Sequence, residues 1–413
     1  MTKPFDIPKC QVMQAYKLVK ANAGSAGIDH QSIAHFEENL KDNLYRIWNR
    51  MSSGTYLPPP VKAVSIPKKS GGVRVLGVPT VSDRIAQMVV KLQIEPMLEP
   101  HFLPDSYGYR PRKSAIDAIS ITRRRCWKQD WVLEFDIKGL FDNIPHDLLL
   151  KAVRKHVDCR WALLCIERWL TVPLKKEHGA LESRTKGTPQ GGVVSPILSN
   201  LFLHYVFDAW ISKHYPDIRW CRYADDGLLH CQSLQQAQTM LGILRDRFLQ
   251  CGLELHPEKT KIVYCRDSNR QGVFPVCSFD FLGYTFRGRT VKSREGIIFR
   301  SFSPAVCKSA IKSMNRIIRE SNVRNRVDLN IEDIARWFNP KLQGWINYYG
   351  RFNRSALSPV LKGFNRTLRK WMMCKFSRLR GHKIRSSAAL GRIFESNPTL
   401  FVHWRLSSVG AFA

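Results

Sequence analysis

The chain has 413 residues and carries 65 Lys and Arg against 34 Asp and Glu, a formal net charge of +31. This excess of positive charge predicts a polyanionic partner and binding that weakens with salt, and it disfavours an enzyme for a small neutral substrate. No apolar run is long enough to cross a bilayer and no signal-peptide pattern follows Met1, which predicts a cytoplasmic protein that does not act at a membrane. The length predicts two or three domains.

Residues 1–55 are expected to form helices, because apolar residues recur there at helical spacing. One stripe is Val12, Tyr16 and Val19, and a second is Ile33, Phe36, Leu40, Leu44 and Ile47. The segment between them, residues 22–29, reads Asn-Ala-Gly-Ser-Ala-Gly-Ile-Asp and predicts a loop. Consecutive prolines at residues 58–60 stiffen the passage into the next segment.

Residues 66–74, Ile-Pro-Lys-Lys-Ser-Gly-Gly-Val-Arg, form a basic block that is expected to be extended. Lys62, Lys68 and Arg74 stand at even positions and would share one face of a continuous extended chain. Exposed cations on a strand usually serve only solubility. The spacing alone therefore does not establish a binding site.

Two segments farther along place carboxylates at the ends of apolar strands. Residues 131–136 predict a strand that ends on Asp136, ahead of a glycine and a helix start. Residues 221–230 predict a tight strand–turn–strand with Asp225 and Asp226 adjacent at the turn. Neighbouring carboxylates repel each other unless a cation lies between them, and Mg²⁺ suits both carboxylate and phosphate oxygens. An acidic pair at a turn is usually just solvated, but the third carboxylate upstream favours a metal site that handles phosphates.

Helices are expected at residues 199–211 and 235–250, and from Ser303 onward the pattern becomes helical, with apolar stripes opposite cationic faces. The apolar residues are Ile311, Met314 and Ile318, then Leu361, Phe364, Leu368 and Trp371; the cations are Lys312, Arg316, Arg319, Lys362, Arg366, Arg369 and Lys370. From Arg300 onward 22 Lys and Arg stand against 5 Asp and Glu, so a net +17 of the total +31 lies there. Aromatic residues in this region can build a core, so it is expected to fold. The 11 cysteines lack the Cys-x-x-Cys spacing of a zinc site and are expected to be small buried hydrophobes in a reducing compartment.

In chain order these segments resemble the motifs of reverse transcriptases, and more narrowly the reverse transcriptase/maturase proteins of bacterial group II introns. Residues 66–74 and 106–111 resemble the basic fingers motifs. Palm motifs A, B, C and D and the primer grip correspond, in order, to residues 135–142, 187–196, 223–226, 256–261 and 281–284. Residues 337–350 resemble the maturase signature, and residues 401–405 the end of the DNA-binding segment. The resemblance is to the form without a C-terminal HNH endonuclease domain, because the chain has neither the paired cysteines of such a metal-bound domain nor the room for one.

The resemblance implies an α+β right-hand polymerase fold. Fingers and palm, with an antiparallel palm sheet packed on helices, would precede an α-helical thumb. The implied segments are an N-terminal extension at 1–55, the reverse transcriptase fingers and palm at 56–290, a thumb/maturase (X) domain at 300–380 and a basic DNA-binding segment at 381–413. The loop at 22–29 would either cover the template, as the family's loop is thought to, or simply join two helices.

The resemblance also implies roles for individual residues. Asp136, Asp225 and Asp226 would be catalytic carboxylates that hold two Mg²⁺ ions, for which Mn²⁺ can substitute, and the backbone carbonyl of Ile137 would be a further ligand. Lys259 would protonate the leaving pyrophosphate, with nearby Lys261 as an alternative. The remaining sets are Lys62, Lys68, Arg74, Phe141 and Gln190 for the nucleotide, with Phe141 as the steric gate against ribose; Leu282 and Gly283 for the primer grip; and Arg366, Arg369 and Lys370 for RNA.

These roles describe an RNA-directed DNA polymerase, a nucleotidyltransferase that uses dNTPs, an RNA template and a DNA primer. It would also bind structured intron RNA as a maturase, to assist splicing and retromobility into a DNA target. Two alternatives are a domesticated relative in phage defence or DNA repair, and an RNA-binding splicing cofactor without polymerase activity. The complete set of Asp136, Asp225 and Asp226 argues against the second, and the flanking nucleotide sequence would decide the first.

Overall fold

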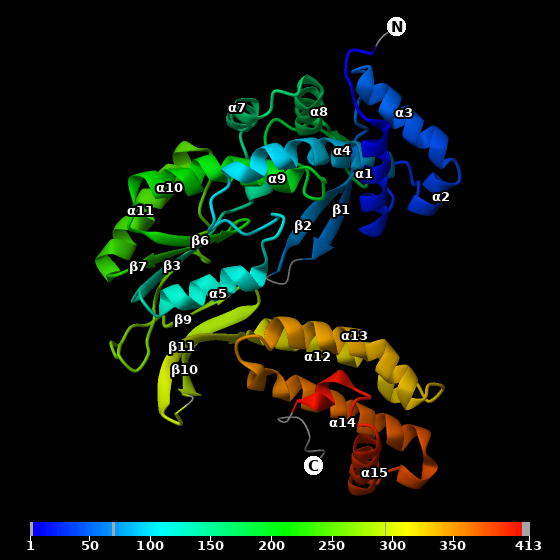
Figure 1. The fold of residues 1–413 in the computed structure, drawn as a ribbon, viewed down its shortest axis with the longest axis vertical. Coiled ribbons are helices and arrows are strands. Elements are labelled where there is room, and N and C mark those ends of the chain that lie inside the picture. Colours follow the sequence, from blue (N-terminus) through cyan, green and yellow to red (C-terminus); the bar gives the residue numbers. More distant parts are fainter. Residues whose placement is uncertain (1–2, 68–70, 294, 407–413) are drawn as a thin grey trace. The chain divides into compact units, whose positions relative to one another are not determined.

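The structure is a computed structural model that describes residues 3–67, 71–293 and 295–406. The chain folds into two compact units. Unit 1 is Met1–Ala118 with Val132–Ile262, and unit 2 is Ile119–Trp131 with Val263–Ala413. Helices and strands are mixed (Figure 1), which confirms the expected α+β class.

The central sheet of unit 1 has the strand order β6-β7-β3-β8. Its strands are β3 (Trp131–Asp136), β6 (Arg219–Tyr223), β7 (Asp226–Cys231) and β8 (Lys261–Tyr264). The expected strand–turn–strand is confirmed, because β6 and β7 pair antiparallel with Tyr223 opposite Asp226. Val132, Leu133 and Phe135 of β3 are all buried, as expected for an apolar strand inside a domain.

Helices α9 (Ser195–Leu203), α10 (Ala209–His214) and α11 (Leu234–Gln250) belong to the same unit as this sheet, and the π-helical turn η2 (His204–Asp208) joins the first two. The ring of Phe135 on β3 lies 5.1 Å from that of Phe207 on η2 and 5.8 Å from that of Phe248 on α11, centroid to centroid. The helix expected at 235–250 is confirmed as α11. The helix expected at 199–211 is part of a longer helical run whose π-helical turn the apolar spacing did not reveal.

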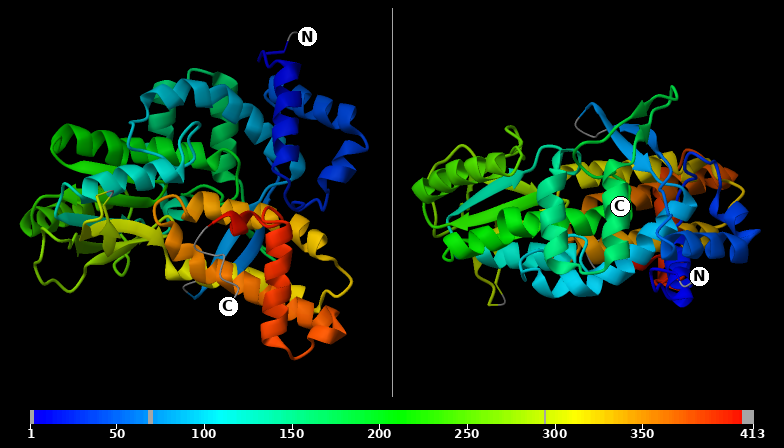
Figure 2. Two further views of the ribbon diagram at one scale, coloured as in Figure 1. Left: turned by 60° about the horizontal axis from the view of Figure 1, so that its bottom comes forward. Right: turned by 90° about the horizontal axis from the view of Figure 1, so that it is seen from above.

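A second sheet of unit 1 has the strand order β2-β1-β4-β5. It consists of β1 (Val61–Pro67), β2 (Val73–Val78) and the short strands β4 (Leu174–Lys175) and β5 (Leu181–Glu182). β1 and β2 are antiparallel, so the single extended chain expected from Lys62 to Arg74 is wrong and a hairpin takes its place. β4 pairs with β1, which places the β4–β5 hairpin beside these strands (Figure 2).

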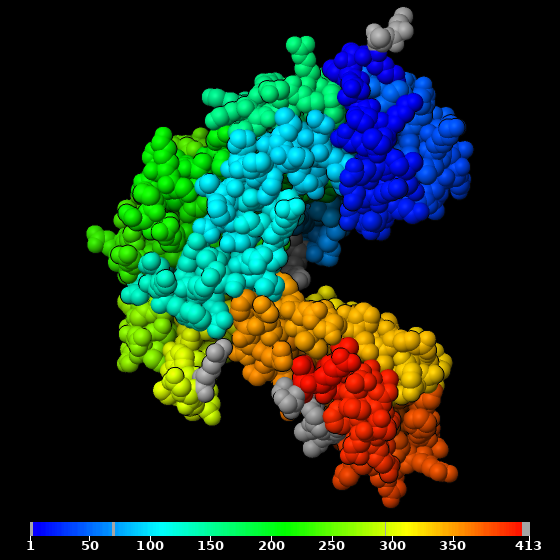
Figure 3. Space-filling view, viewed as in Figure 1, coloured from blue at the N-terminus to red at the C-terminus, as the bar shows by residue number. Residues whose placement is uncertain are grey.

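The helix α4 (Val81–Leu98) is buried on most of its surface. The other helices of unit 1 are α1 (Lys9–Ala21), α2 (Ile33–Glu37), α3 (Leu40–Ser52), α6 (Leu140–Asn143), α7 (His146–His156) and α8 (Arg160–Thr171), with the 3-10 turn η1 (Glu99–His101). α1 and α3 pack directly on α4 (Figure 3). Val12, Tyr16 and Val19 are buried on α1, which confirms the first apolar stripe, whereas the second is divided between α2 and α3.

The loop expected at residues 22–29 is confirmed as the connection between α1 and α2. The guanidinium of Arg84 on α4 donates to the carbonyl of Ser25 at 2.8 Å and to that of Ala23 at 3.4 Å. These bonds hold the loop against α4. Its expected role over a template stays a prediction.

Unit 2 contains a three-stranded meander in the order β11-β10-β9. Its strands are β9 (Ser278–Phe281), β10 (Tyr284–Lys292) and β11 (Ile298–Val306). The ring of Tyr284 lies 5.7 Å from that of Tyr349 on the helix α13 (Ile331–Tyr349). The meander therefore folds with the helical region, and the boundary between the units falls well before the expected one at residues 290–300.

The helices of unit 2 build a core of their own. Besides α13 they are α12 (Lys308–Glu320), α14 (Ser358–Lys375) and α15 (Lys383–Ser396), with α5 (Ala115–Cys126) spanning the boundary of the units and the 3-10 turns η3 (Val323–Asn325), η4 (Arg354–Leu357), η5 (Ser377–Leu379) and η6 (Val402–Arg405). The expected apolar stripes are confirmed, since Met314 and Ile318 on α12 and Leu361, Phe364, Leu368 and Trp371 on α14 are buried. No helix in the described part of the chain is long and apolar enough to span a membrane.

The stretch expected to form a separate DNA-binding segment at 381–413 shares this core. Phe401 and His403 are fully buried and Trp404 is 3% exposed. Nε2 of His403 and Nε1 of Trp404 both donate to Oδ1 of Asn365 on α14, at 2.8 and 3.1 Å. The described residues up to 406 are therefore integral to unit 2, and a boundary at residue 381 does not divide the structure.

Candidate active site

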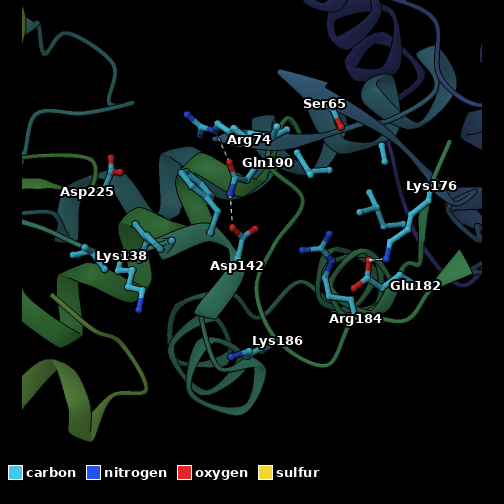
Figure 4. A pocket seen from close by; sticks show the side chains of 18 of the residues that line it. Ser65, Arg74, Lys138, Asp142, Lys176, Glu182, Arg184, Lys186, Gln190 and Asp225 are labelled. Carbon is cyan, nitrogen blue, oxygen red and sulfur yellow. Dashed lines mark hydrogen bonds and ion pairs between the residues drawn. The ribbon is translucent and has the colours of Figure 1, made fainter. Parts of the chain in front are cut away.

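A cavity of about 1060 Å³ opens within unit 1 between the β1–β2 strands, the end of β3 and the β4–β5 hairpin (Figure 4). Residues expected to act in catalysis or nucleotide binding line it: Arg74, Asp136, Ile137, Phe141, Gln190, Asp225 and Lys259. They are separated by up to 185 positions in the sequence, from 74 to 259. Tertiary folding alone therefore brings them together.

Asp225 stands in the turn between β6 and β7, directly after Ala224, whose φ of +56° is left-handed. Asp225 lines the cavity, whereas Asp226, the first residue of β7, is not among the lining residues. Burial and repulsion from Asp136 raise the pKa of Asp225. Burial and the charges of Asp225, Asp136 and Glu134 raise the pKa of Asp226 to about 7. The three expected carboxylates thus lie close enough to destabilise one another's charge.

The donor atoms at this cluster suit magnesium in an open site. No three His, Cys, Asp or Glu side chains among the described residues could enclose a metal ion by themselves. Mg²⁺ in phosphoryl-transfer sites, however, is held by one or two carboxylates and completes its coordination with waters and substrate phosphates. Asp136 and Asp225 supply such carboxylates at one cavity, where burial and the charge of Asp136 raise the pKa of Asp225. The residues therefore fit a cation that a bound triphosphate would share.

The expected ligand role of the Ile137 carbonyl is compatible with the local backbone pairing. The amide of Lys138 donates to the carbonyl of Glu254 at 2.8 Å, and the amide of His256 donates to the carbonyl of Asp136 at 2.8 Å. Neither bond uses the carbonyl of Ile137, which stands between the two paired residues. Its coordination of a metal stays a prediction.

The two lysines near motif D have different partners. Nζ of Lys259 lies 3.0 Å from Oδ2 of Asp136, and Lys259 lines the cavity. Nζ of Lys261 instead lies 3.2 Å from Oε2 of Glu134. The geometry thus places Lys259, and not Lys261, next to Asp136.

Gln190 joins two walls of the cavity. Nε of Arg74 donates to Oε1 of Gln190 at 2.6 Å, and Nε2 of Gln190 donates to Oδ2 of Asp142 at 2.8 Å (Figure 4). The next residue, Gly191, has a φ of +125°, and a Cβ there would lie 2.6 Å from the carbonyl oxygen of Gly77 on β2. Only glycine therefore allows this turn to approach the strand so closely.

Phe141 belongs both to the protein interior and to the cavity wall. Its side chain is 8% exposed and lines the cavity. Gly139, with a φ of +57°, caps the short helix α6 on which Phe141 stands. The carbonyl of Phe141 accepts a hydrogen bond from the amide of Thr188 at 2.6 Å. The ring is therefore held firmly where it can limit the space available to a ligand.

The structure does not bring Lys62 to this cavity, contrary to the expectation that it acts with Arg74. In the β1–β2 register Arg74 is opposite Ile66, while Lys62 is opposite Val78. Four residues of a strand separate the two positions by about 13 Å. Lys68, the third expected cation, lies outside the described residues.

Sequence reasoning missed Arg222, which is fully buried directly ahead of the catalytic turn. Its guanidinium pairs with Asp208 of η2 at 2.5 Å, and its Nη1 donates to the carbonyl of Ala224 and to Oδ1 of Asn200, each at 3.0 Å. A buried charge needs such partners, because leaving it unpaired is costly. Arg222 therefore fixes the turn that carries Asp225. An arginine between Cys221 and Tyr223, in the interior of a strand, was the available signal.

A second missed network supports the turn that carries Gln190. Asp83 on α4 is fully buried. It accepts hydrogen bonds from Tyr56 Oη at 2.7 Å, Trp169 Nε1 at 2.8 Å and Gln87 Nε2 at 2.9 Å. Oε1 of Gln87 in turn accepts from the amide of Val193 at 2.7 Å. Asp and Gln four positions apart in an apolar helical stretch would have been the sequence signal.

The wall opposite the carboxylates was also not expected from the sequence. Lys176, Glu182, Arg184 and Lys186, on and beside the β4–β5 hairpin, line it (Figure 4). Lys176 pairs with Glu182 at 3.1 Å, whereas Nε of Arg184 is buried without a hydrogen-bond partner among the described residues. Cations on this wall make the cavity suited to a phosphate chain.

In unit 2, the expected primer-grip residues Leu282 and Gly283 form the two-residue turn between β9 and β10, with φ values of +49° and +78°. Oη of Tyr348 donates to the carbonyl of Leu282 at 2.8 Å. A Cβ on Gly283 would lie 3.2 Å from the ring of Tyr349. The positive φ and this ring explain the glycine, and its contact with a primer stays a prediction.

The three cations expected to bind RNA differ in their exposure. Arg366 and Lys370 on α14 are exposed. Arg369 is half-buried, and its Nη1 donates to Oγ of Ser387 on α15 at 3.1 Å. Arg369 therefore also joins two helices, so it differs from a purely solvent-facing cation.

Two protein-family models match the chain. The family described as reverse transcriptase (RNA-dependent DNA polymerase) matches residues 66–286, which include Asp136, Asp225 and Lys259. The group II intron, maturase-specific domain matches residues 311–388, from α12 to α15. The first match spans more than half of the 413 residues.

Several proteins are similar to the chain. Protein YkfC of Escherichia coli (strain K12) is 30% identical over an alignment of 295 positions, and the match covers 60% of this chain and 75% of that protein. Group II intron-encoded protein LtrA of Lactococcus lactis subsp. cremoris is 34% identical over 194 residues, 46% of this chain and 32% of LtrA. Among solved structures, telomerase from Candida albicans with a fragment of telomeric RNA has a TM-score of 0.45 at 14% identity, and the match covers 92% of this chain and 69% of that chain.

Proposed function

Since the chain belongs to the reverse transcriptase (RNA-dependent DNA polymerase) family and carries a group II intron maturase-specific domain, we propose that it extends a DNA primer on an RNA template and binds intron RNA to assist splicing and mobility. As a family member it is an RNA-directed DNA polymerase. Its proposed partners are dNTPs, structured intron RNA and a DNA target. The 11 free cysteines support the cytoplasm as its proposed location.

One observation carries the polymerase proposal: Asp136 and Asp225, far apart in sequence, line one cavity together with Phe141 and Gln190. Phosphoryl transfer depends mainly on positioning and on neutralisation of charge. Carboxylates at one wall and cations at another meet both needs, because a triphosphate requires positive charge around its oxygens.

Each residue at the cavity has a proposed task. Asp136 and Asp225 would hold two Mg²⁺ ions, or Mn²⁺ in their place, with Asp226 and the Ile137 carbonyl beside them. Bound magnesium would increase the acidity of the primer 3′-hydroxyl and stabilise negative charge on the phosphates. Lys259, whose Nζ lies 3.0 Å from Oδ2 of Asp136, would protonate the departing pyrophosphate.

The nucleotide would be positioned by residues from both sheets. Arg74 would bind the triphosphate, since its guanidinium lines the cavity. Gln190, held between Arg74 and Asp142, would pack beside the new base pair. Phe141 would close the space next to the sugar, which would exclude a 2′-hydroxyl.

The maturase part of the proposal rests on unit 2. Its helical region bears a net charge of +17 from Arg300 onward, and Arg366 and Lys370 are exposed on α14. Structured RNA crowds phosphates at its junctions, and exposed cations on helices suit such a surface. The opposite faces of these helices are buried, so the charges are presented by a folded scaffold.

The test is primer extension by the full chain on a preannealed RNA template and DNA primer, with dNTPs and Mg²⁺. Asp225→Asn removes one carboxylate charge and should reduce extension by about 10³-fold or more, as loss of a catalytic group does. Binding to RNA should remain, since the basic surfaces are untouched. Asp217→Asn makes the same change at an exposed site ahead of β6 and should extend normally. Undiminished extension by Asp225→Asn would reject the site.

A further inference from the structure

A separate cavity of about 390 Å³ lies within unit 2, between α12, the turn η3 and one face of α14. Three cations and three amide side chains stand around it: Arg319, Arg324, Lys370, Asn315, Asn322 and Asn325. Ile318 and Val323, 6% and 0% exposed, are its apolar lining. The cavity thus combines positive charge, paired donor and acceptor groups, and an apolar surface.

The cations of this cavity are not neutralised by carboxylates of the chain. Neighbouring arginines do have acidic partners, since Arg316 pairs with Glu320 at 3.8 Å and Arg326 with Asp328 at 2.7 Å. Within the described residues no ion pair engages Arg319, Arg324 or Lys370. Three converging cations without a countercharge favour an anionic ligand.

The cavity is shaped in advance by its own hydrogen bonds. Asn322 has a left-handed φ of +51°, and its Oδ1 accepts from Nδ2 of Asn325 at 2.8 Å. Nε1 of Trp371 donates to the carbonyl of Arg326 at 2.9 Å, and Nζ of Lys375 donates to the carbonyl of Leu329 at 2.6 Å. These bonds hold the turn after α12 on α14, so a ligand would lose little entropy in ordering the site.

Its size and chemistry match one nucleotide. Small-molecule sites range from about 300 to 1,000 Å³, so this volume admits one nucleotide and not a helix. An Asn amide presents a donor and an acceptor, as a base edge does, and unpaired bases are read through their edges and faces. The wall of the cavity is open at Gly363 on α14. A Cβ built at this glycine would have no atom closer than Nη2 of Arg366 at 3.7 Å and Oδ1 of Asn315 at 3.8 Å.

We propose that this cavity binds one unpaired nucleotide extruded from structured RNA, with its phosphate at Arg319, Arg324 and Lys370 and its base edge at Asn315 and Asn325. The proposal rests on the proposed RNA binding by unit 2 and adds a recognition site to it. Phosphate alone would explain the cations, but it would use neither the amides nor the apolar lining at Ile318 and Val323. The amides would therefore give preference among RNAs, and the cations would give affinity.

The test compares RNA hairpins that share one stem and either are fully paired or carry a single bulged A, C, G or U. The full chain should bind at least one bulged hairpin about fivefold or more tightly than the paired one. Asn315→Leu keeps the approximate size of the side chain but removes its amide. It should abolish this preference without changing the salt dependence of binding. Asn315 is exposed on α12, so the helix should tolerate the change, which circular dichroism would check.

Charge variants distinguish phosphate binding at the cavity from non-specific electrostatic attraction between the RNA and the basic surface of the protein. Arg319→Gln with Lys370→Gln should weaken binding to the bulged hairpin, lower the log–log salt slope by up to about 0.9 for each phosphate that is no longer neutralised, and reduce the preference. The control, Lys312→Gln with Lys362→Gln, removes two exposed cations of the same helices that do not line the cavity. It should lower the slope and leave the preference intact.

The outcomes distinguish failure of the proposed nucleotide site from failure of the proposed RNA binding by unit 2. Equal binding of all bulged and paired hairpins, or a preference that survives Asn315→Leu, would overturn the nucleotide site and leave RNA binding in place. Failure to bind any of the hairpins, together with normal primer extension, would instead refute RNA binding by unit 2. Extension of a short preannealed primer should be normal in Asn315→Leu and in the control with Lys312→Gln and Lys362→Gln, because none of these three residues lines the polymerase cavity.

Discussion

At the scale of single residues, the two adjacent aspartates at the turn between β6 and β7 have different surroundings. Asp225 lines the cavity, while Asp226 does not line it and is half-buried, with the charges of Asp225, Asp136 and Glu134 nearby. Neighbouring positions at the start of a strand direct their side chains apart. Arg222, which precedes the pair on β6, holds the carbonyl of Ala224 and so orients Asp225. The two aspartates therefore differ in their access to the cavity.

A prediction at this scale concerns Phe141. Phe141→Val opens space in the cavity wall, and incorporation of ribonucleotides relative to deoxynucleotides should rise about tenfold or more, because a steric barrier to the 2′-hydroxyl is removed. The measurement is the ratio of the two incorporation efficiencies on one template. Phe135→Val is the matched control, since Phe135 is 1% exposed on β3 and does not line the cavity.

Phe135→Val should lower the free energy of unfolding by about 2–4 kcal/mol, as removal of a buried ring does, and leave the ratio unchanged. Should Phe141→Val likewise change stability alone, its ring would be a core side chain and the sugar would be selected elsewhere.

At the scale of elements, the turn that carries Gln190 is held from two sides. The amide of Gly77 on β2 donates to the carbonyl of Gln190 at 2.8 Å. On the other side Oε1 of Gln87 on α4 accepts from the amide of Val193 at 2.7 Å, and Asp83 orients Gln87 at 2.9 Å. A loop with partners on a strand and on a buried helix has little freedom. Gln190, the residue proposed to bind the nucleotide, is therefore positioned by the hydrogen bonds that β2 and α4 make with its own turn.

The matching prediction is that Gln87→Leu raises KM for dNTPs about tenfold while kcat falls less. The change leaves the amide of Val193 without its acceptor, which costs about 1–3 kcal/mol and loosens the turn. Steady-state primer extension with varied dNTP concentration measures both constants.

Gln11→Leu is the control, because Nε2 of Gln11 donates to the carbonyl of Val89 on the same helix at 3.0 Å, away from the turn. Both variants should lose some stability, but only Gln87→Leu should change KM. Equal KM values in the two variants would mean that Gln87 acts on stability alone.

At the scale of the whole molecule, each unit has its own core, and in both units burial lowers the pKa of histidine side chains. His204 and His156 lie in unit 1. In unit 2 burial lowers the pKa of His403 from 6.5 to about 3. The unfolded chain therefore binds a proton at His403 below pH 6.5 while the folded chain does not. This contribution to stability is complete above pH 6.5 and is lost as the pH falls toward 3.

His403→Gln should flatten the pH dependence of unfolding. Wild-type stability should fall by up to about 1.4 kcal/mol per pH unit from this group between pH 6.5 and 4, and the variant should lack that part of the slope. The Gln amide can still donate to Asn365, so the fold should persist. Thermal denaturation of both proteins at half-unit pH steps measures the difference. Parallel curves would show that His403 does not titrate on unfolding.

The sequence by itself determined which residues are proposed to carry the chemistry. Asp136, Asp225 and Gln190 were identified from their motifs, and the apolar stripes at 12–19 and 361–371 are buried as their spacing predicted. Such features are local. A residue type, a helical period and a turn signal need only neighbouring positions, and the family resemblance supplied their order along the chain.

Only the tertiary structure decided which of these residues meet. It placed Arg74 at the cavity and Lys62 about 13 Å away along the hairpin, because strand register depends on pairing between distant segments. It placed Lys259, rather than Lys261, beside Asp136. It also packed the stretch at 401–405 into the core of unit 2. The hydrogen-bond partners of Arg222 and Asp83 could likewise not be predicted from the sequence. A buried polar residue is explained only by its partners, and folding alone brings those partners within hydrogen-bond distance, although Arg222 and its partner Ser106 are 116 positions apart.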